Sequence, residues 1–216
     1  MTVPADSPLT EAAARSPGPA PEPAPGLLST PPVGPIEIVP MRRRHLRSVI
    51  RIEVQSYPRP WSLGLYLSEL ALGGLRFYIV ARRAGEVVGY GGVMYIGPDA
   101  HVTTLAAAPE FQRQGIGGRV LWHLARAAVA HGAENLTLEV RVSNGAAIEL
   151  YRRFGFVPAG VRKNYYAEIK EDALVMWAND IGAPEYGERL DRLAAELDLI
   201  PGKAAPGAAG ATTEAP

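Results

Sequence analysis

The distribution of proline confines the foldable part of this chain to its middle. Ten of the twenty prolines lie within the first 35 of 216 residues, among Ala, Ser and Gly and with few large apolar side chains. Such a composition cannot bury enough apolar surface to offset the entropy cost of ordering, so we expect residues 1–34 to form a disordered tail. Residues 201–216 have the same composition, and we expect a second tail there. The remainder, roughly 150 residues, matches the usual size of one domain.

The order of predicted elements defines the fold class. Alternating apolar and polar residues predict strands over residues 36–39 and 136–142. Strand-like runs between turns predict strands over residues 76–83, 86–96 and 101–107, and residues 156–167 and 172–178 complete the set. Helical spacing predicts helices over residues 61–72, 115–131 and 144–154, and an earlier helix with Leu46, Val49, Ile50 and Val54 on its inward face. The order β-α-α-β-β-β-α-β-α-β-β indicates an α+β fold rather than the regular alternation of a doubly wound sheet.

A last amphipathic helix is predicted within residues 182–200, after a domain at 35–181. Pro184 precedes it, and Tyr186, Leu190, Leu193 and Leu197 fall in line on one face. That face either packs on the domain or forms a surface for a partner.

Composition excludes several classes of function. The chain has no cysteine, which excludes a disulfide scaffold, a cysteine nucleophile and a Cys-based metal site. Its four histidines (His45, His101, His123, His131) lack metal-ligand spacing, so we expect no metal, and surface or capping positions for them. The net charge is zero, which gives no global case for direct nucleic-acid binding, although the arginines at 42–44 could steer an acidic or ribosomal partner.

No segment predicts secretion or membrane insertion. The first residues lack a basic stretch followed by an apolar run, and no run approaches the roughly 20 apolar residues of a membrane span. We therefore expect a cytoplasmic protein that does not bind membranes. We also expect it to be a monomer or weak dimer.

A glycine-rich segment, Gln112-Arg113-Gln114-Gly115-Ile116-Gly117-Gly118, joins a predicted strand to the longest predicted helix. Glycines let the backbone approach a ligand, and a helix start offers unpaired N–H groups, so phosphate is the expected guest. No Lys-Ser or Lys-Thr follows the glycines, which excludes a P-loop, and Leu121 stands where the dinucleotide fingerprint needs Gly. The loop alone leaves several nucleotides possible.

Further motifs follow the loop in order. Leu138-Glu139-Val140-Arg141-Val142-Ser143-Asn144 comes about twenty residues later, then residues 147–156 (AIELYRRFGF), residues 162–166 (RKNYY) and Glu171-Asp172-Ala173. With Gln112-x-x-Gly115-x-Gly117, this succession resembles the Gln/Arg-x-x-Gly-x-Gly/Ala signature and later motifs of the GNAT family of N-acetyltransferases. Within that family, the succession is similar to the RimI-like branch, and so is Pro60-Trp61-Ser62. The resemblance spans residues 36–178.

The resemblance implies a GNAT fold, which is a mixed, mostly antiparallel sheet with a splayed central strand pair, and acetyl-CoA as co-substrate. Backbone N–H groups of the loop would hold the pyrophosphate, and the strand before it would pair with the pantetheine arm. The implied cofactor-binding residues are Leu105, Ala106, Ala107, Gln112, Arg113, Gln114, Gly115, Ile116, Gly117, Gly118 and Asn144. Asn144 is also a candidate helix N-cap.

Two residues are implied as catalytic. Glu139 alternates with Leu138 and Val140 along its strand, so its side chain points to the other face. If that face lines a cleft, the carboxylate is the general base; otherwise it is an ordinary solvent-facing glutamate. Tyr151 lies on the inward stripe of its helix, where the family has a general acid for the departing thiolate; the alternative is core packing.

The RimI-like resemblance also implies the acceptor, which is the N-terminal α-amine of a ribosomal protein. Without cysteine, we expect direct attack in a ternary complex. The candidate residues for binding the acceptor are Tyr57, Trp61, Arg162, Tyr165 and Tyr166, with Lys163 beside them. Two alternatives stay open: a GNAT enzyme acting on a lysine or small-molecule amine, and a catalytically silent acyl-CoA-binding module.

Overall fold

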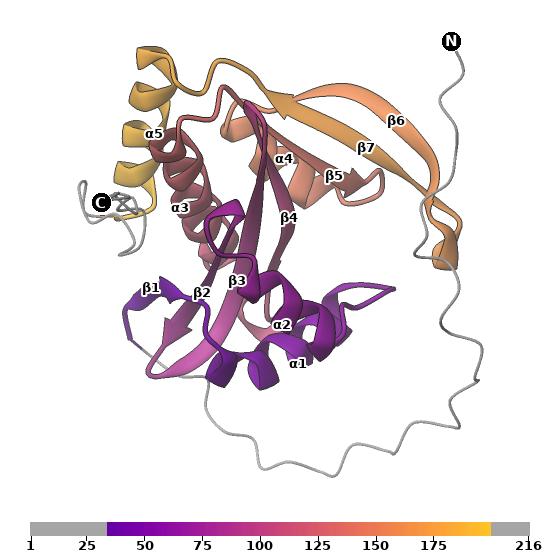
Figure 1. Ribbon diagram of the computed structural model, residues 1–216. Coiled ribbons are helices and arrows are strands. Elements are labelled where there is room, and N and C mark those ends of the chain that lie inside the picture. The colour runs from indigo at the N-terminus through magenta and orange to yellow at the C-terminus, as the bar shows by residue number, and fades with distance from the viewer. Residues whose placement is uncertain (1–33, 200–216) are drawn as a thin grey trace, which may run out of the picture. The chain divides into compact units, whose positions relative to one another are not determined.

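A seven-stranded sheet forms the centre of the molecule (Figure 1). The computed structural model describes residues 34–199, so both predicted tails lie outside the described residues apart from Gly34. The sheet order is β1-β2-β3-β4-β5-β7-β6. The strands are β1 (Ile36–Pro40), β2 (Arg76–Arg83), β3 (Glu86–Ile96), β4 (Asp99–Ala107), β5 (Asn135–Arg141), β6 (Val157–Tyr166) and β7 (Glu171–Ala178). All neighbours are antiparallel except β4 and β5, which confirms the predicted mixed sheet.

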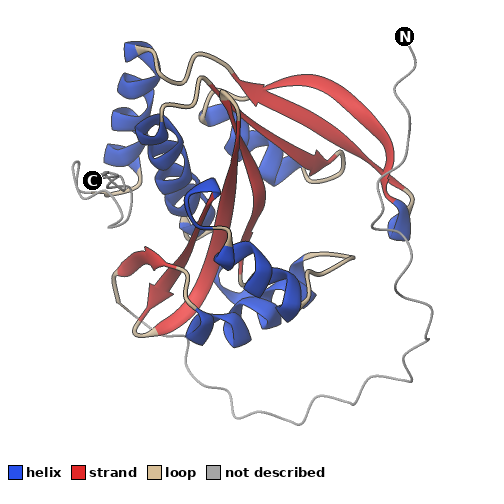
Figure 2. Ribbon diagram, in the orientation of Figure 1, coloured by secondary structure: helices blue, strands red, loops and turns tan. Residues whose placement is uncertain are grey.

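Helices cover both faces of this sheet (Figure 2). The helices are α1 (Leu46–Ser56), α2 (Leu63–Ala71), α3 (Ile116–His131), α4 (Gly145–Arg153) and α5 (Pro184–Glu196). Helix α5 packs against α3, where Trp122 Nε1 donates to the Leu190 carbonyl at 2.8 Å. Leu190, Leu193 and Tyr186 of α5 are buried in the same core as the sheet. The apolar face of α5 therefore packs on the domain, as one of its two interpretations predicted.

The two parallel strands separate soon after they meet. Strands β4 and β5 pair only from Asp99–Asn135 to His101–Thr137, whereas β4 continues to Ala107 and β5 to Arg141. The predicted splay of the central strand pair is thereby confirmed. Beyond His101, the edge of β4 that faces β5 has no strand partner, and a cleft opens there.

Local capping explains where several helices begin and end. The helix predicted from Trp61 begins at Leu63 instead, because Ser62 Oγ accepts the N–H of Leu65 at 3.2 Å and acts as N-cap. Asn144 caps α4 in the same way by accepting the N–H of Ala147 at 3.2 Å. Gly132 ends α3 with φ 86°, a left-handed conformation that favours glycine.

The inward face of α1 differs from the prediction. Val54 is 62% exposed, and the buried residues are Leu46, Val49, Ile52 and, at 2% exposed, Glu53. Placing Val54 on the inward stripe was therefore wrong. Glu53 is buried on this face instead of Val54, because neighbouring groups donate hydrogen bonds to its carboxylate, as a buried charge requires.

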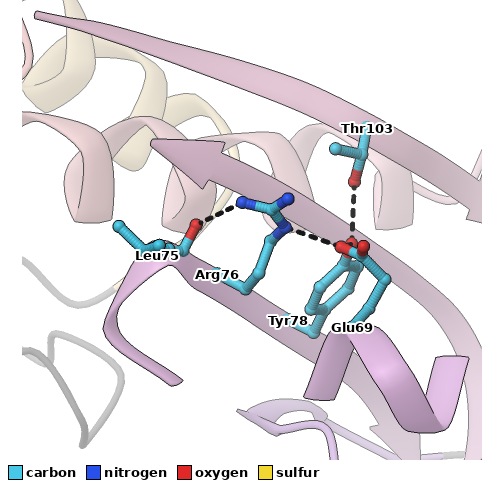
Figure 3. Close-up of polar contacts among 5 residues, drawn as sticks. All are labelled: Glu69, Leu75, Arg76, Tyr78 and Thr103. Atoms are coloured by element: carbon cyan, nitrogen blue, oxygen red, sulfur yellow. Dashed lines mark hydrogen bonds and ion pairs between the residues drawn. The ribbon is translucent and has the colours of Figure 1, made fainter. Parts of the chain in front are cut away.

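A polar network fastens α2 to the sheet beside the splay (Figure 3). Glu69 Oε2 accepts from Arg76 Nε and from the Tyr78 hydroxyl, both at 2.7 Å. The same hydroxyl lies 3.3 Å from Thr103 Oγ1 on β4, and Arg76 also donates to the Leu75 carbonyl at 3.0 Å. This network ties α2, β2 and β4 together at one point.

The ring of Tyr78 requires a glycine opposite it on β3. A Cβ built on Gly92 would lie 2.1 Å from a ring carbon of Tyr78, so Gly92→Ala must displace the ring. We expect a loss of about 1–3 kcal/mol in the free energy of unfolding, measured by urea denaturation. Gly64→Ala is the matched control, because its Cβ would meet only Ser62 Oγ at 3.8 Å. Equal stability of Gly92→Ala and the wild type would contradict this packing.

Candidate active site

A cleft of about 860 Å³ occupies the splay between β4 and β5. It extends from the start of α3, along the end of β4, to side chains of β5 and α4. The predicted site residues that line it are Tyr57, Trp61, Leu105, Ala106, Ala107, Gln112, Arg113, Gly115, Ile116, Gly117, Gly118, Glu139, Asn144, Tyr151, Tyr165 and Tyr166. Gln114 and Arg162 are not among the lining residues. Gln114 instead accepts from Arg83 at 2.6 Å.

The glycine-rich loop turns sharply before α3. Arg113 has φ 58° and Gly115 has φ 76°, so two of its residues are left-handed. The first intrahelical bond runs from the N–H of Arg119 to the carbonyl of Gly115 at 3.0 Å. The N–H groups of residues 116–118 precede that bond and have no partner within the helix, which suits a phosphate group at this end of α3.

Two glycines of this loop also serve packing. A Cβ on Gly118 would lie 3.0 Å from Leu197, which follows α5, and one on Gly117 would lie 3.4 Å from Leu150 of α4. Leu197 and Leu150 therefore cover the first turn of α3. Glycine at these two positions lets Leu150 and Leu197 approach α3 closely. The sequence pattern did not reveal this second reason for glycine here.

The hydroxyl of Tyr57 lies against β4 inside the splay. It donates to the Leu105 carbonyl at 2.7 Å and accepts the Leu105 N–H at 3.1 Å. Thr104 Oγ1 approaches the same hydroxyl at 3.4 Å. Both main-chain groups of Leu105, which were expected to bind a cofactor, are thus hydrogen-bonded to Tyr57, which was expected to bind an acceptor.

Glu139 of β5 forms the charged centre of the cleft and is largely buried, with a side chain 9% exposed. Its carboxylate lies 3.1 Å from His101 Nε2 and 3.1 Å from a guanidinium nitrogen of Arg162. Burial raises the pKa of Glu139, but the hydrogen bond and charge of His101 together with the charge of Arg162 outweigh burial, and the net pKa is lowered. The carboxylate is therefore ionised at neutral pH.

His101 is a site residue that the sequence analysis missed. The expectation of a surface or capping position holds for His45, whose Nδ1 accepts the N–H of Arg42 at 3.1 Å, but it is wrong for His101. His101 stands opposite Thr137 where β4 and β5 pair, which directs its ring to the neighbouring Glu139. Only the parallel pairing of distant strands brings the two together, so no local signal could have found it.

Tyr151 of α4 borders the cleft and is 7% exposed. Burial raises the pKa of its phenol far above the usual range, and the neighbouring Tyr57 and Tyr166 phenols raise it further. Burial likewise raises the pKa of Tyr166 to about 12. The phenols of Tyr151 and Tyr166 therefore keep their protons at neutral pH and can act as hydrogen-bond donors.

Glu53 is the second residue that the sequence analysis missed. Its carboxylate accepts the N–H of Trp61 at 3.0 Å and the Tyr66 hydroxyl at 2.8 Å, and it also accepts the Tyr90 hydroxyl. Burial raises the pKa of Glu53, and the bonds from Trp61 and Tyr66 oppose the rise. The bond from Trp61 fixes the α1–α2 loop, which carries Tyr57, to α1.

Comparison with known proteins agrees with this geometry. The model of the acetyltransferase (GNAT) family matches residues 46–156, so the fold is that of an acetyltransferase. A Bacillus subtilis (strain 168) protein is 37% identical over 137 residues, covering 63% of this chain and 91% of that protein. The chain belongs to the GNAT family and is an N-acetyltransferase.

Two further relatives carry a named activity. The [ribosomal protein bS18]-alanine N-acetyltransferase of Escherichia coli (strain K12) is 34% identical over 133 residues, 61% of this chain and 88% of that protein. The crystal structure of the ribosomal-protein-S18-alanine N-acetyltransferase from Escherichia coli matches with a TM-score of 0.62 and 31% identity, covering 67% of this chain and 94% of that one.

Residues 34–199 show neither a membrane-spanning helix nor a cluster of metal ligands. None of the described helices combines the length and apolar character needed to cross a membrane. Within the same residues, no group of three or more His, Cys, Asp or Glu side chains could hold a metal ion.

Proposed function

We propose that this enzyme transfers acetyl from acetyl-CoA to the N-terminal α-amine of a protein, and that the protein is a ribosomal one. One observation carries the proposal: Glu139 and Tyr151 line the same cleft as the phosphate-binding start of α3. The activity named for the Escherichia coli relatives supports the choice of acceptor. The presence of an ionised carboxylate and a protonated phenol in one cleft argues against a silent binding module.

The cleft fits acetyl-CoA at both ends. The N–H groups of residues 116–118, which have no partner within the helix, suit its pyrophosphate, and the edge of β4 that β5 leaves uncovered suits an extended arm with amide groups. Acetyl-CoA, when bound, supplies the activated acetyl group as a thioester. The residues of this chain then bind it, orient the acceptor amine, and move two protons.

Glu139 takes the proton of the attacking amine, directly or through water, with His101 and Arg162 holding its carboxylate in place. Tyr151 donates to the departing sulfur. Trp61, Tyr165 and Tyr166 line the cleft beyond these groups, and we assign them to binding of the acceptor chain.

The lowered pKa of Glu139 favours an α-amine over a lysine. A weak base cannot deprotonate a strongly basic ammonium group efficiently, so the acceptor must be partly neutral at working pH. An α-amine has a pKa near 8 and a lysine side chain one near 10.4, so the neutral fraction at pH 7 differs by about 230-fold. The cleft therefore suits an N-terminus.

Binding and acceptor choice are tested together. Saturating acetyl-CoA, at about 100 times its Kd, should raise the melting temperature by about 5–10 °C, measured by scanning calorimetry. The enzyme should then acetylate a peptide beginning with Ala far faster than the same peptide with a blocked N-terminus and one internal Lys, as followed by mass spectrometry.

Each outcome bears on a separate part of the proposal. No thermal shift at millimolar acetyl-CoA would remove the cofactor assignment. Acetylation confined to the lysine peptide would leave the cofactor in place and refute the α-amine acceptor.

A further inference from the structure

We infer that Tyr57 is a positioning residue. In the free enzyme its hydroxyl occupies the backbone groups of β4 at which the pantetheine arm of acetyl-CoA would bind, and it is displaced from them when acetyl-CoA binds. This inference rests on the proposed function, because it assigns what happens at one point of the same cleft. It adds an exchange step that neither the motifs nor the comparisons describe.

The contacts of Tyr57 are those that a neighbouring strand would make. One hydroxyl both donates to the carbonyl and accepts from the N–H of the same residue, Leu105. Where strands of the sheet pair, as at His101 with Thr137, such backbone groups are satisfied by the neighbouring strand. At Leu105 a side chain from the α1–α2 loop does so instead.

The splay creates the need for this substitute. Strand β5 stops pairing with β4 after His101, so the peptide groups that face the gap further along β4 have no strand beside them. A buried peptide N–H or carbonyl without a partner destabilises the fold. In the absence of a ligand, the hydroxyl of Tyr57 removes that penalty at Leu105.

A bound ligand needs the same groups. The cleft runs without interruption from residues 115–118, past residues 103–107 of β4, to Glu139. A molecule with its phosphates at α3 and its reactive end at Glu139 must therefore pass Leu105. Its amide groups and the Tyr57 hydroxyl therefore compete for the same N–H and carbonyl of Leu105.

The anchoring of Tyr57 leaves its side chain free to exchange. The N–H of Tyr57 donates to the carbonyl of Glu53 at 3.0 Å, and the N–H of Trp61 donates to the carboxylate of the same residue. The α1–α2 loop is thus fixed on both sides of residues 58–60. Rotation of the phenol away from Leu105 breaks neither of these bonds.

Removal of the hydroxyl should tighten binding of acetyl-CoA. In Tyr57→Phe the Leu105 groups are unpaired in the free enzyme, and ligand binding relieves that penalty without displacing a competitor. We expect the Kd for acetyl-CoA to fall about tenfold by titration calorimetry. The Kd for adenosine 3′,5′-bisphosphate, which carries the nucleotide end without the arm, should stay unchanged.

Tyr95→Phe is the matched control, since Tyr95 stacks on His131 at a ring distance of 3.7 Å and does not line the cleft. It should alter neither constant. Unchanged or weaker binding of acetyl-CoA to a folded Tyr57→Phe enzyme would overturn the exchange, and parallel tightening of both ligands would mean a general effect on the fold. A wild type that binds no acetyl-CoA would instead refute the proposed function.

A measurement on the wild type decides the question even if the variant does not fold. With leucine amides labelled with nitrogen-15, the Leu105 resonance should shift when acetyl-CoA is added and stay in place with adenosine 3′,5′-bisphosphate. If the Leu105 resonance does not shift when acetyl-CoA is added, Tyr57 keeps its hydrogen bonds to Leu105, and the inference fails.

Discussion

Tyr151→Phe is expected to lower kcat by about 10²–10⁴-fold, the usual contribution of a general acid. The phenol of Tyr151 borders the cleft and stays protonated because burial raises its pKa. Phenylalanine keeps the ring that packs on Phe156 at a centroid distance of 5.8 Å, so only the proton donor is lost. The Kd for acetyl-CoA should change by less than about threefold, since the hydroxyl acts on the departing sulfur.

Steady-state kinetics and titration calorimetry separate these two quantities. Tyr186→Phe is the matched control, because Tyr186 is a buried tyrosine of α5 whose hydroxyl has no partner among residues 34–199. It should leave kcat unchanged. Full activity of Tyr151→Phe would remove Tyr151 as the acid and leave water as the source of the proton.

Glu139→Gln is the second change with a large expected effect, a loss of about 10²–10³-fold in kcat. Glutamine keeps the shape and can still accept from His101, but it cannot take a proton. Glu149→Gln provides a control, since Glu149 is an exposed residue of α4 that pairs with Arg152 at 3.8 Å. An active Glu139→Gln enzyme would show that the acceptor amine loses its proton without this carboxylate.

The pH profile of the wild type follows from the lowered pKa of Glu139. Its folded pKa lies below the ordinary 4.5, so the carboxylate is ionised above that value, and protonation removes its contribution to stability only as the pH falls below it. Between pH 6 and 8, kcat/KM should therefore rise with the α-amine, whose pKa is near 8. A plateau from pH 6 upward would contradict this assignment.

Patterns that are local in sequence predicted much of the architecture. The glycines before α3, the cap at Asn144 and the alternation around Glu139 depend on neighbouring residues only. The structure has α3 and α4 near their predicted bounds, and it has Glu139 in the cleft. The order of elements indicated an α+β fold, and the resemblance to the GNAT family implied the mixed sheet.

Features that depend on distant contacts could not be predicted. Glu53 interrupts an apolar stripe, and its burial is tolerable because the hydroxyls of Tyr66 and Tyr90 and the N–H of Trp61 donate to its carboxylate. His101 meets Glu139 because two strands far apart in sequence pair at that point. The position of Tyr57 on Leu105 likewise follows from the end of that pairing.

The packing of Leu197 on Gly118 has a consequence for the order in which the site is assembled during synthesis. Leu197 is made after all seven strands and after the loop that it covers. A nascent chain that has completed the sheet still lacks this cover on the first turn of α3. The first turn of α3 is therefore covered last, once the segment after α5 has left the ribosome and folded back on α3.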